Sequence, residues 1–299
     1  MGGRPGSSWR LKMSRNCSGG ARLPGFRDWG ICMARPVRKF VDGQHGQIHL
    51  RIATPAAPSK RPLACLHMSP KSGRIFARFI EAAADDRIVL AHDYPGFGES
   101  DPPPSSPPVT IEDYAQSLWD VVDALGLGVI DLLGYHTGSE VAAEAARQRP
   151  DQVGAIVMIS APVFSPEELK LMHETYEHIP LDVEGTRFRI MWEKVVHHRG
   201  PGTDLEAMAM SFAENLRAGE NYEWGHRAAF EYAPKYPAVV GALSHRITVL
   251  MPGDELAEFT PRIAPYLANG EIIAHPEWGH GFLDAHTEAA VTAVKAALG

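Results

Sequence analysis

The segment Leu132-Leu133-Gly134-Tyr135-His136-Thr137-Gly138-Ser139 runs from an apolar strand directly into a predicted helix. Gly134 and Gly138 flank His136 at this junction. Small residues on both sides let strand and helix approach closely, so the residue between them projects from a strained turn. Two glycines four positions apart mean little alone in a chain with 28 glycines, but their place between a strand and a helix gives the pattern weight.

Short apolar runs alternate with amphipathic segments on both sides of this junction. The predicted strands are Lys39–Val41, Ile48–Ala53, Leu63–His67, Ile88–Ala91, Ile130–Leu133, Ala155–Ile159, Ile247–Met251 and Ile272–Ala274. The predicted helices are Phe76–Ala84, Ile111–Leu125, Ser139–Arg149, Pro261–Leu267 and Thr287–Leu298. Almost wholly apolar strands separated by helices indicate parallel strands buried on both faces. The first two strands are predicted to form an antiparallel hairpin. We therefore expect an α/β fold with a mostly parallel, eight-stranded sheet flanked by helices.

Residues 164–240 interrupt this alternation with helical segments and no strand. The segments are Pro166–His178, Phe188–His197, Leu205–Arg217 and Tyr222–Tyr232. An all-helical insertion predicts a lid, leaving 36–163 and 241–299 as the core. The insertion carries Met172, Met191, Trp192, Met208, Met210, Phe212, Trp224 and Phe230. Most such residues are expected in packing, but some should face the cleft and favour an apolar or aromatic substrate.

Composition excludes several classes of protein. No apolar run approaches the ~18 residues of a membrane span, and a net charge of −7 argues against nucleic-acid binding. Cys17, Cys32 and Cys65 are too few and scattered for a disulfide framework or a zinc site. We expect a cytoplasmic protein that acts on a small molecule without nucleic acid or membrane as partner. The oligomeric state, including a homo-oligomer, stays open.

The first 35 residues differ from the rest. Residues 1–32 are basic, rich in Gly, Arg and Ser, and without helical or strand periodicity. Such a segment cannot bury enough apolar surface to order itself. It is predicted to be a disordered tail or an extension upstream of a start at Met33, with a targeting peptide as the alternative.

Two further motifs complete the pattern. Asp93-Tyr94-Pro95-Gly96-Phe97-Gly98-Glu99-Ser100 forms a turn after a strand, and Pro276-Glu277-Trp278-Gly279-His280-Gly281-Phe282 follows the last strand. In this order, over about residues 36–299, the chain resembles the α/β-hydrolase fold family. The resemblance implies that His136 occupies the nucleophile elbow, where the family carries G-x-S-x-G, and that His280 is the catalytic histidine. The usual nucleophilic hydroxyl is absent.

The same resemblance suggests the other site residues. A carboxylate after the strand Ile247–Met251 should hold His280; Asp254 is favoured, with Glu255 next and Glu258 as a further candidate. The oxyanion hole should use the N–H of Thr137 and one near Met68 or Ser69, with Met68 replacing the family's glycine. His197 and His198 are adjacent and lack ligands at metal-binding spacing, so no metal is expected there. No cofactor motif is present.

The sequence leaves three roles open for His136. It can act as general base or nucleophile, it can orient a substrate for other groups, or it can belong to a pocket that only binds. We expect a cofactor-independent hydrolase of an ester, lactone, thioester or activated C–C bond. The alternatives are a non-catalytic small-molecule binding protein or receptor, and a lyase or isomerase of the same fold.

Overall fold

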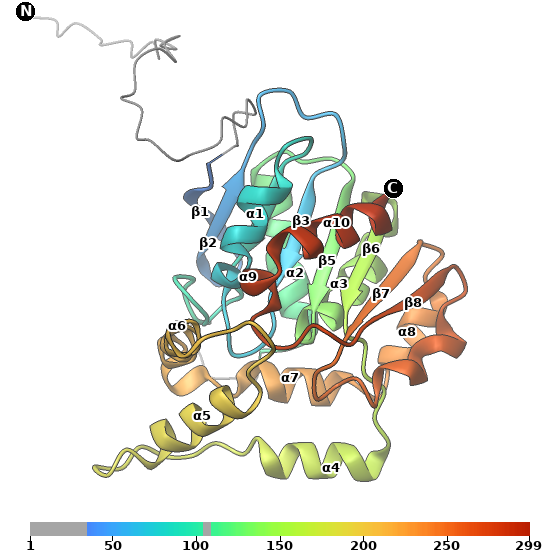
Figure 1. Cartoon of the computed structure of the whole chain (residues 1–299). Coiled ribbons are helices and arrows are strands. Elements are labelled where there is room, and N and C mark those ends of the chain that lie inside the picture. The colour runs from blue at the N-terminus through green and yellow to red at the C-terminus, as the bar shows by residue number, and fades with distance from the viewer. Residues whose placement is uncertain (1–34, 104–108) are drawn as a thin grey trace, which may run out of the picture. The chain divides into compact units, whose positions relative to one another are not determined.

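The computed structural model describes residues 35–103 and 109–299 (Figure 1). The predicted N-terminal extension lies outside these ranges apart from Arg35. The described residues belong to one structural unit by their contacts. No helix among them combines the length and the apolar character needed to cross a membrane.

An eight-stranded sheet forms the centre of the fold, as the alternating pattern predicts. The strands are β1 (Val37–Gly43), β2 (Gly46–Ala53), β3 (Leu63–Leu66), β4 (Val89–His92), β5 (Ile130–Tyr135), β6 (Val153–Ile159), β7 (Ile247–Pro252) and β8 (Gly270–His275). Their order is β1-β2-β4-β3-β5-β6-β7-β8. β1 pairs with β2, and β2 with β4, in antiparallel register, while every other pairing is parallel. The fold class and the N-terminal hairpin are thus confirmed.

Helices cover both faces of this sheet (Figure 1). The core helices are α1 (Ala77–Ala83), α2 (Ile111–Ala124), α3 (Thr137–Gln148), α8 (Tyr236–Ala242), α9 (Phe282–Ala285) and α10 (Thr287–Leu298). α1, α9 and α10 contact one another on one face, and α3 contacts α2 and α8 on the other. Each face has its own buried apolar cluster, one containing Trp119 of α2 and the other Phe79 of α1. Burial on both faces explains why the parallel strands are apolar throughout.

The segment between β6 and β7 is helical, as expected. It contains α4 (Pro166–Thr175), α5 (Thr186–His197), α6 (Leu205–Arg217) and α7 (Trp224–Tyr232), followed by α8. The sequence pattern did not predict α8 or the short α9. The role of the helical segment 164–240 as a lid stays a prediction.

One predicted helix is wrong in type. Residues Thr260–Tyr266 form a 3-10 helix instead of the predicted α-helix Pro261–Leu267. Pro265 has no N–H to donate to the carbonyl four residues earlier, so an α-helical ladder is interrupted there. Two more 3-10 turns, Gly73–Phe76 and Pro150–Gln152, lie next to core elements, and a third, Gly219–Asn221, links α6 to α7.

Candidate active site

His136 sits alone between β5 and α3 on a strained backbone. Its φ is 50° and its ψ is −112°, a conformation that a side-chain-bearing residue seldom adopts. A Cβ on Gly134 would lie 2.3 Å from the Gly138 carbonyl oxygen, and one on Gly138 would lie 2.0 Å from that of Leu66. Both glycines are therefore required for the close approach that projects His136. Ser139 instead donates its hydroxyl to buried backbone carbonyls and does not line the cavity.

The elbow imidazole is paired with a buried carboxylate. His136 Nε2 lies 2.9 Å from Asp254 Oδ2, and the Asp254 side chain is fully buried. Asp254 follows β7 and also accepts the Leu256 N–H at 3.0 Å and, at 3.4 Å, the hydroxyl of Ser160, which follows β6. Since β5, β6 and β7 are neighbours, their carboxyl ends bring these groups to one edge of the sheet.

The pairing of acid and histidine differs from the expectation. Asp254 was expected to hold His280, but it binds His136, and Glu255 binds His280 instead. His280 Nε2 lies 2.9 Å from both carboxylate oxygens of Glu255. Successive residues in the loop after β7 direct their side chains to different neighbours, which explains the exchange. Glu258 does not line the cavity.

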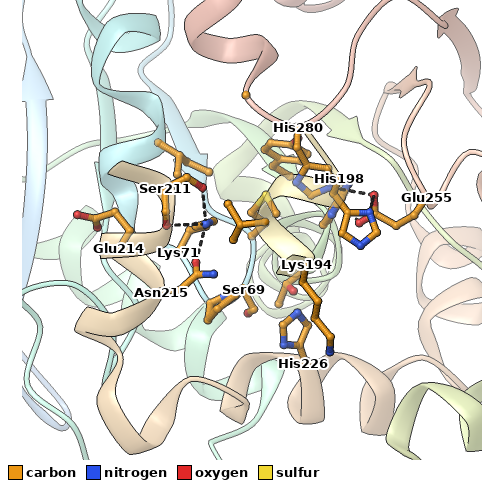
Figure 2. A pocket seen from close by; sticks show the side chains of 18 of the residues that line it. Ser69, Lys71, Lys194, His198, Ser211, Glu214, Asn215, His226, Glu255 and His280 are labelled. Atoms are coloured by element: carbon orange, nitrogen blue, oxygen red, sulfur yellow. Dashed lines mark hydrogen bonds and ion pairs between the residues drawn. The ribbon is translucent and has the colours of Figure 1, made fainter. Parts of the chain in front are cut away.

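A third imidazole joins this group. His198, just after α5, places Nδ1 3.6 Å from Glu255 Oε2, and its ring centre is 5.6 Å from that of His280. The rings of His136 and His280 are 5.4 Å apart between centres. Sequence reasoning missed His198 as a neighbour of this site, because only the packing of the helical segment brings it to the loop after β8. Figure 2 shows His198, Glu255 and His280 together on one side of the pocket.

The negative charges around His136 raise the pKa of its imidazole. Burial alone would lower the pKa of His136, but the negative charge of Asp254, its hydrogen bond and the charge of Glu255 outweigh burial, so the pKa is raised. Burial would raise the pKa of Glu255, but His280 and His136 hold it well below its usual range. Burial lowers the pKa of His198.

The ring nitrogen that remains available on His136 is Nδ1. With Nε2–H donated to Asp254, Nδ1 of the neutral ring carries a lone pair. Within residues 35–103 and 109–299, Nδ1 makes no hydrogen bond, and His136 lines the cavity. The arrangement can therefore take a proton from, or attack, a ligand at this position.

The residues predicted for the oxyanion hole border the same cavity. Met68 and Ser69 follow β3, and Thr137 is the first residue of α3. The N–H of a first helical residue has no partner within its own helix and can be donated to a ligand. The role of these three residues stays a prediction. His67, by contrast, accepts the Tyr94 N–H through Nε2 and contacts the Met68 carbonyl through Nδ1, which makes it a structural residue.

The cavity has a volume of about 940 Å³ and reaches under the helical segment. Five of the methionine and aromatic residues singled out in that segment line it, and Trp192, Phe212 and Trp224 do not. The five are Met172, Met191, Met208, Met210 and Phe230. A cavity of this size with a largely apolar wall fits a small organic molecule.

One group of side chains could hold a metal ion. Single ligand atoms from His136, Asp254 and His280 lie within 4.8 Å of one another. The sequence did not predict this, because the three residues come from separate loops. In the structure, one nitrogen of each ring already faces a carboxylate.

Comparisons with known proteins agree with this architecture. A family model described as "alpha/beta hydrolase fold" matches residues 61–219. The chain is 27% identical over 129 residues to a proline iminopeptidase of Heyndrickxia coagulans. The matched region covers 42% of this chain and 43% of that protein. It is 30% identical over 116 residues to the lipase LipV of Mycobacterium tuberculosis, covering 39% and 42%. The match thus spans less than half the length of these curated relatives.

Solved structures are similar over most of the chain. An esterase from Exiguobacterium antarcticum has a TM-score of 0.71 at 16% identity, covering 88% of this chain and 99% of that one. The enol-lactonase from Burkholderia xenovorans LB400 has a TM-score of 0.72 at 14% identity, covering 87% and 99%. At such identities the likeness concerns the fold alone. With the family model matching more than half of the sequence, the chain belongs to the α/β-hydrolase fold family.

Proposed function

We propose that this protein is a cofactor-independent hydrolase in which His136, oriented by Asp254, replaces the usual serine. One observation carries the proposal. His136, on its strained turn, places Nε2 2.9 Å from the fully buried carboxylate of Asp254. A buried acid that fixes the tautomer of an imidazole is the arrangement that catalytic triads use for their base. Relatives with the names of a peptidase and a lipase support hydrolysis as the reaction class.

The proposed reaction uses both imidazoles. His136 Nδ1 removes a proton from water, which attacks the carbonyl carbon of an ester, lactone or thioester, or of the ketone in an activated C–C bond. The N–H groups of Thr137 and the Met68–Ser69 loop bind the oxyanion. His280, held by Glu255, passes the proton that His136 has taken on to the leaving group, so both rings return to their starting form. The methionines of the wall favour a small apolar or aromatic substrate.

A binding protein is the second candidate, because the elbow lacks a hydroxyl nucleophile. Turnover of p-nitrophenyl esters, a homoserine lactone and an acyl thioester by wild-type protein separates the two. We expect multiple turnovers of at least one of them. Tight binding of such compounds without any turnover would instead favour the binding protein or receptor.

The pH dependence of kcat/KM should follow the protonation of His136. Only its neutral form can accept a proton, so kcat/KM is expected to rise with pH through an inflection above the ordinary value of 6.5. In Asp254→Asn the ring loses the charge that raises its pKa, and burial then lowers it. The inflection should move to lower pH, and the plateau should fall by about 10²–10⁴-fold because the tautomer is no longer fixed.

A variant of an exposed neighbour serves as control for this profile. His197 does not line the cavity. His197→Ala should keep both the inflection and the plateau of the wild type. An inflection that stays in place in Asp254→Asn would show that His136 is not the titrating base.

Cofactor independence has its own test. We expect hydrolysis to survive dialysis against EDTA, and elemental analysis to find less than one transition metal per chain. Loss of activity on dialysis, with recovery on adding Zn²⁺ or Mn²⁺, would mean that His136, Asp254 and His280 bind a metal. The base would then be a metal-bound hydroxide rather than an imidazole.

A further inference from the structure

A lysine and a serine meet on another wall of the cavity. Lys71 lies in the loop after β3, and Ser211 lies in the middle of α6. The Lys71 Nζ is 2.6 Å from the Ser211 Oγ, and both residues line the cavity. Figure 2 shows them together with Asn215, away from the group formed by His198, Glu255 and His280. The proposed function gives this pair no role.

The direct contacts of Lys71 are to neutral oxygens. Besides Ser211 Oγ, its Nζ contacts the Ser211 carbonyl oxygen at 2.8 Å and Asn215 Oδ1 at 2.5 Å. Among the described residues, no carboxylate oxygen lies within 4.0 Å of this nitrogen. The nearby Glu214 accepts the Ser72 hydroxyl at 2.6 Å and pairs with Arg74. The lysine is thus buried without a direct counter-charge.

The contacts of Lys71 serve both forms of the amine. The charged amine donates one N–H to each of the three oxygens around it. Burial lowers the pKa of Lys71 to about 7, against the opposing charge of Glu214. The neutral amine can still donate its two N–H groups to the Ser211 carbonyl and Asn215 Oδ1, and its lone pair can then accept the Ser211 hydroxyl proton. A serine with its hydroxyl donated to a base is the geometry of an activated nucleophile.

We propose that Lys71 and Ser211 form a second nucleophilic centre that transfers acyl groups from activated carboxylic esters or thioesters. Ser211 Oγ forms a bond to the acyl carbon while its proton passes to Lys71 Nζ. The bond from the acyl carbon to the leaving oxygen or sulfur then breaks, and the leaving group takes that proton. Water, deprotonated by the neutral Lys71, releases the acid and restores the serine. The proposal does not rest on His136.

Asn215 is a positioning residue in this centre. Its Oδ1 accepts one N–H of Lys71 and so directs the lone pair toward Ser211. The centre also combines a loop of the core with α6, so it exists only where α6 lies over the loop after β3.

Covalent labelling tests the nucleophile directly. A fluorophosphonate should modify wild-type protein at Ser211, located by peptide mapping, and the rate should rise with pH through an inflection near the Lys71 pKa of about 7. Ser211→Ala should give no adduct in that peptide. Lys71→Met should slow the labelling by about 10²-fold or more. Lys170→Met, which changes an exposed lysine outside the cavity, should leave the rate unchanged.

Asn215→Asp provides a readout that a purely structural contact would not give. A carboxylate beside Lys71 Nζ should raise the pKa of the lysine by about 1–3 units. The inflection for labelling of Ser211 should move up by a similar amount, while circular dichroism and thermal unfolding show a folded protein. Labelling whose rate and inflection do not respond to Asn215→Asp or Lys71→Met would overturn the proposal, as would an unmodified Ser211 in wild-type protein.

The two proposals fail separately. A strong fall in ester turnover in His136→Ala, with a residual turnover that Ser211→Ala removes and with normal labelling of Ser211, supports both centres. If Ser211→Ala keeps full turnover and Ser211 is never labelled, this centre is refuted while the function proposed for His136 stands. If His136→Ala keeps full turnover and Ser211 is labelled, only the function of His136 is refuted.

Discussion

His136→Ala is expected to lower kcat/KM for ester or lactone substrates by about 10²–10⁴-fold at a pH above the raised pKa of His136. The substitution removes the imidazole of the elbow and leaves Asp254 buried without its partner. The loss should fall on kcat more than on KM, because a base acts in the transition state rather than in binding. Steady-state kinetics with thermal unfolding as a folding check measure it. His197→Ala is the matched control and should match the wild type.

His136→Ser separates catalysis by imidazole from a lost serine mechanism. A serine at the elbow removes the imidazole that Asp254 holds and leaves that buried carboxylate without its partner. We therefore expect turnover below that of the wild type. Turnover that occurs in His136→Ser but not in the wild type would contradict the proposed function and favour a binding protein with a vestigial hydrolase site.

Gly138→Ala is expected to have the largest effect on stability. The new Cβ would lie 2.0 Å from the Leu66 carbonyl oxygen, so β3 and α3 would have to separate. The contacting atom belongs to the backbone of a central strand, which cannot move aside as the end of a flexible side chain can. We therefore expect the free energy of unfolding to fall by more than about 3 kcal/mol, or the protein not to fold. Denaturant unfolding measures the change.

Gly128→Ala is the control for this substitution. Gly128 has no atom within 4 Å of the position of a Cβ, and its backbone is not in the left-handed region. Its free energy of unfolding should change by less than about 0.5 kcal/mol. Equal effects of the two substitutions would mean that the contact between strand and helix is not what requires Gly138.

The sequence predicts the elbow because its signals are local. Gly134 and Gly138 lie within one strand–turn–helix junction, and the apolar runs around them report burial through their own periodicity. For the same reason all eight strands could be placed. α8 was missed because a short helix within a helical insertion has no distinct pattern, and Pro265 changed one predicted α-helix to a 3-10 helix.

The partners within the site depend on side-chain directions that no local pattern contains. Asp254 and Glu255 are adjacent and both acidic, so their order along the chain does not tell which faces His136 and which His280. The turn after β7 decides this. His198 likewise reaches Glu255 only through the packing of the helical segment.

The amino-acid sequence alone determined the sheet and the tight junction, since these follow from hydrophobic periodicity and from glycine's small size, and its resemblance to the α/β-hydrolase family showed an imidazole where a hydroxyl is usual. Tertiary structure alone decided which acid holds which histidine and that Lys71 meets Ser211, 140 residues away along the chain. Contacts at that separation form only after loops and helices from different parts of the chain have packed, so they depend on the folded arrangement and not on neighbouring residues.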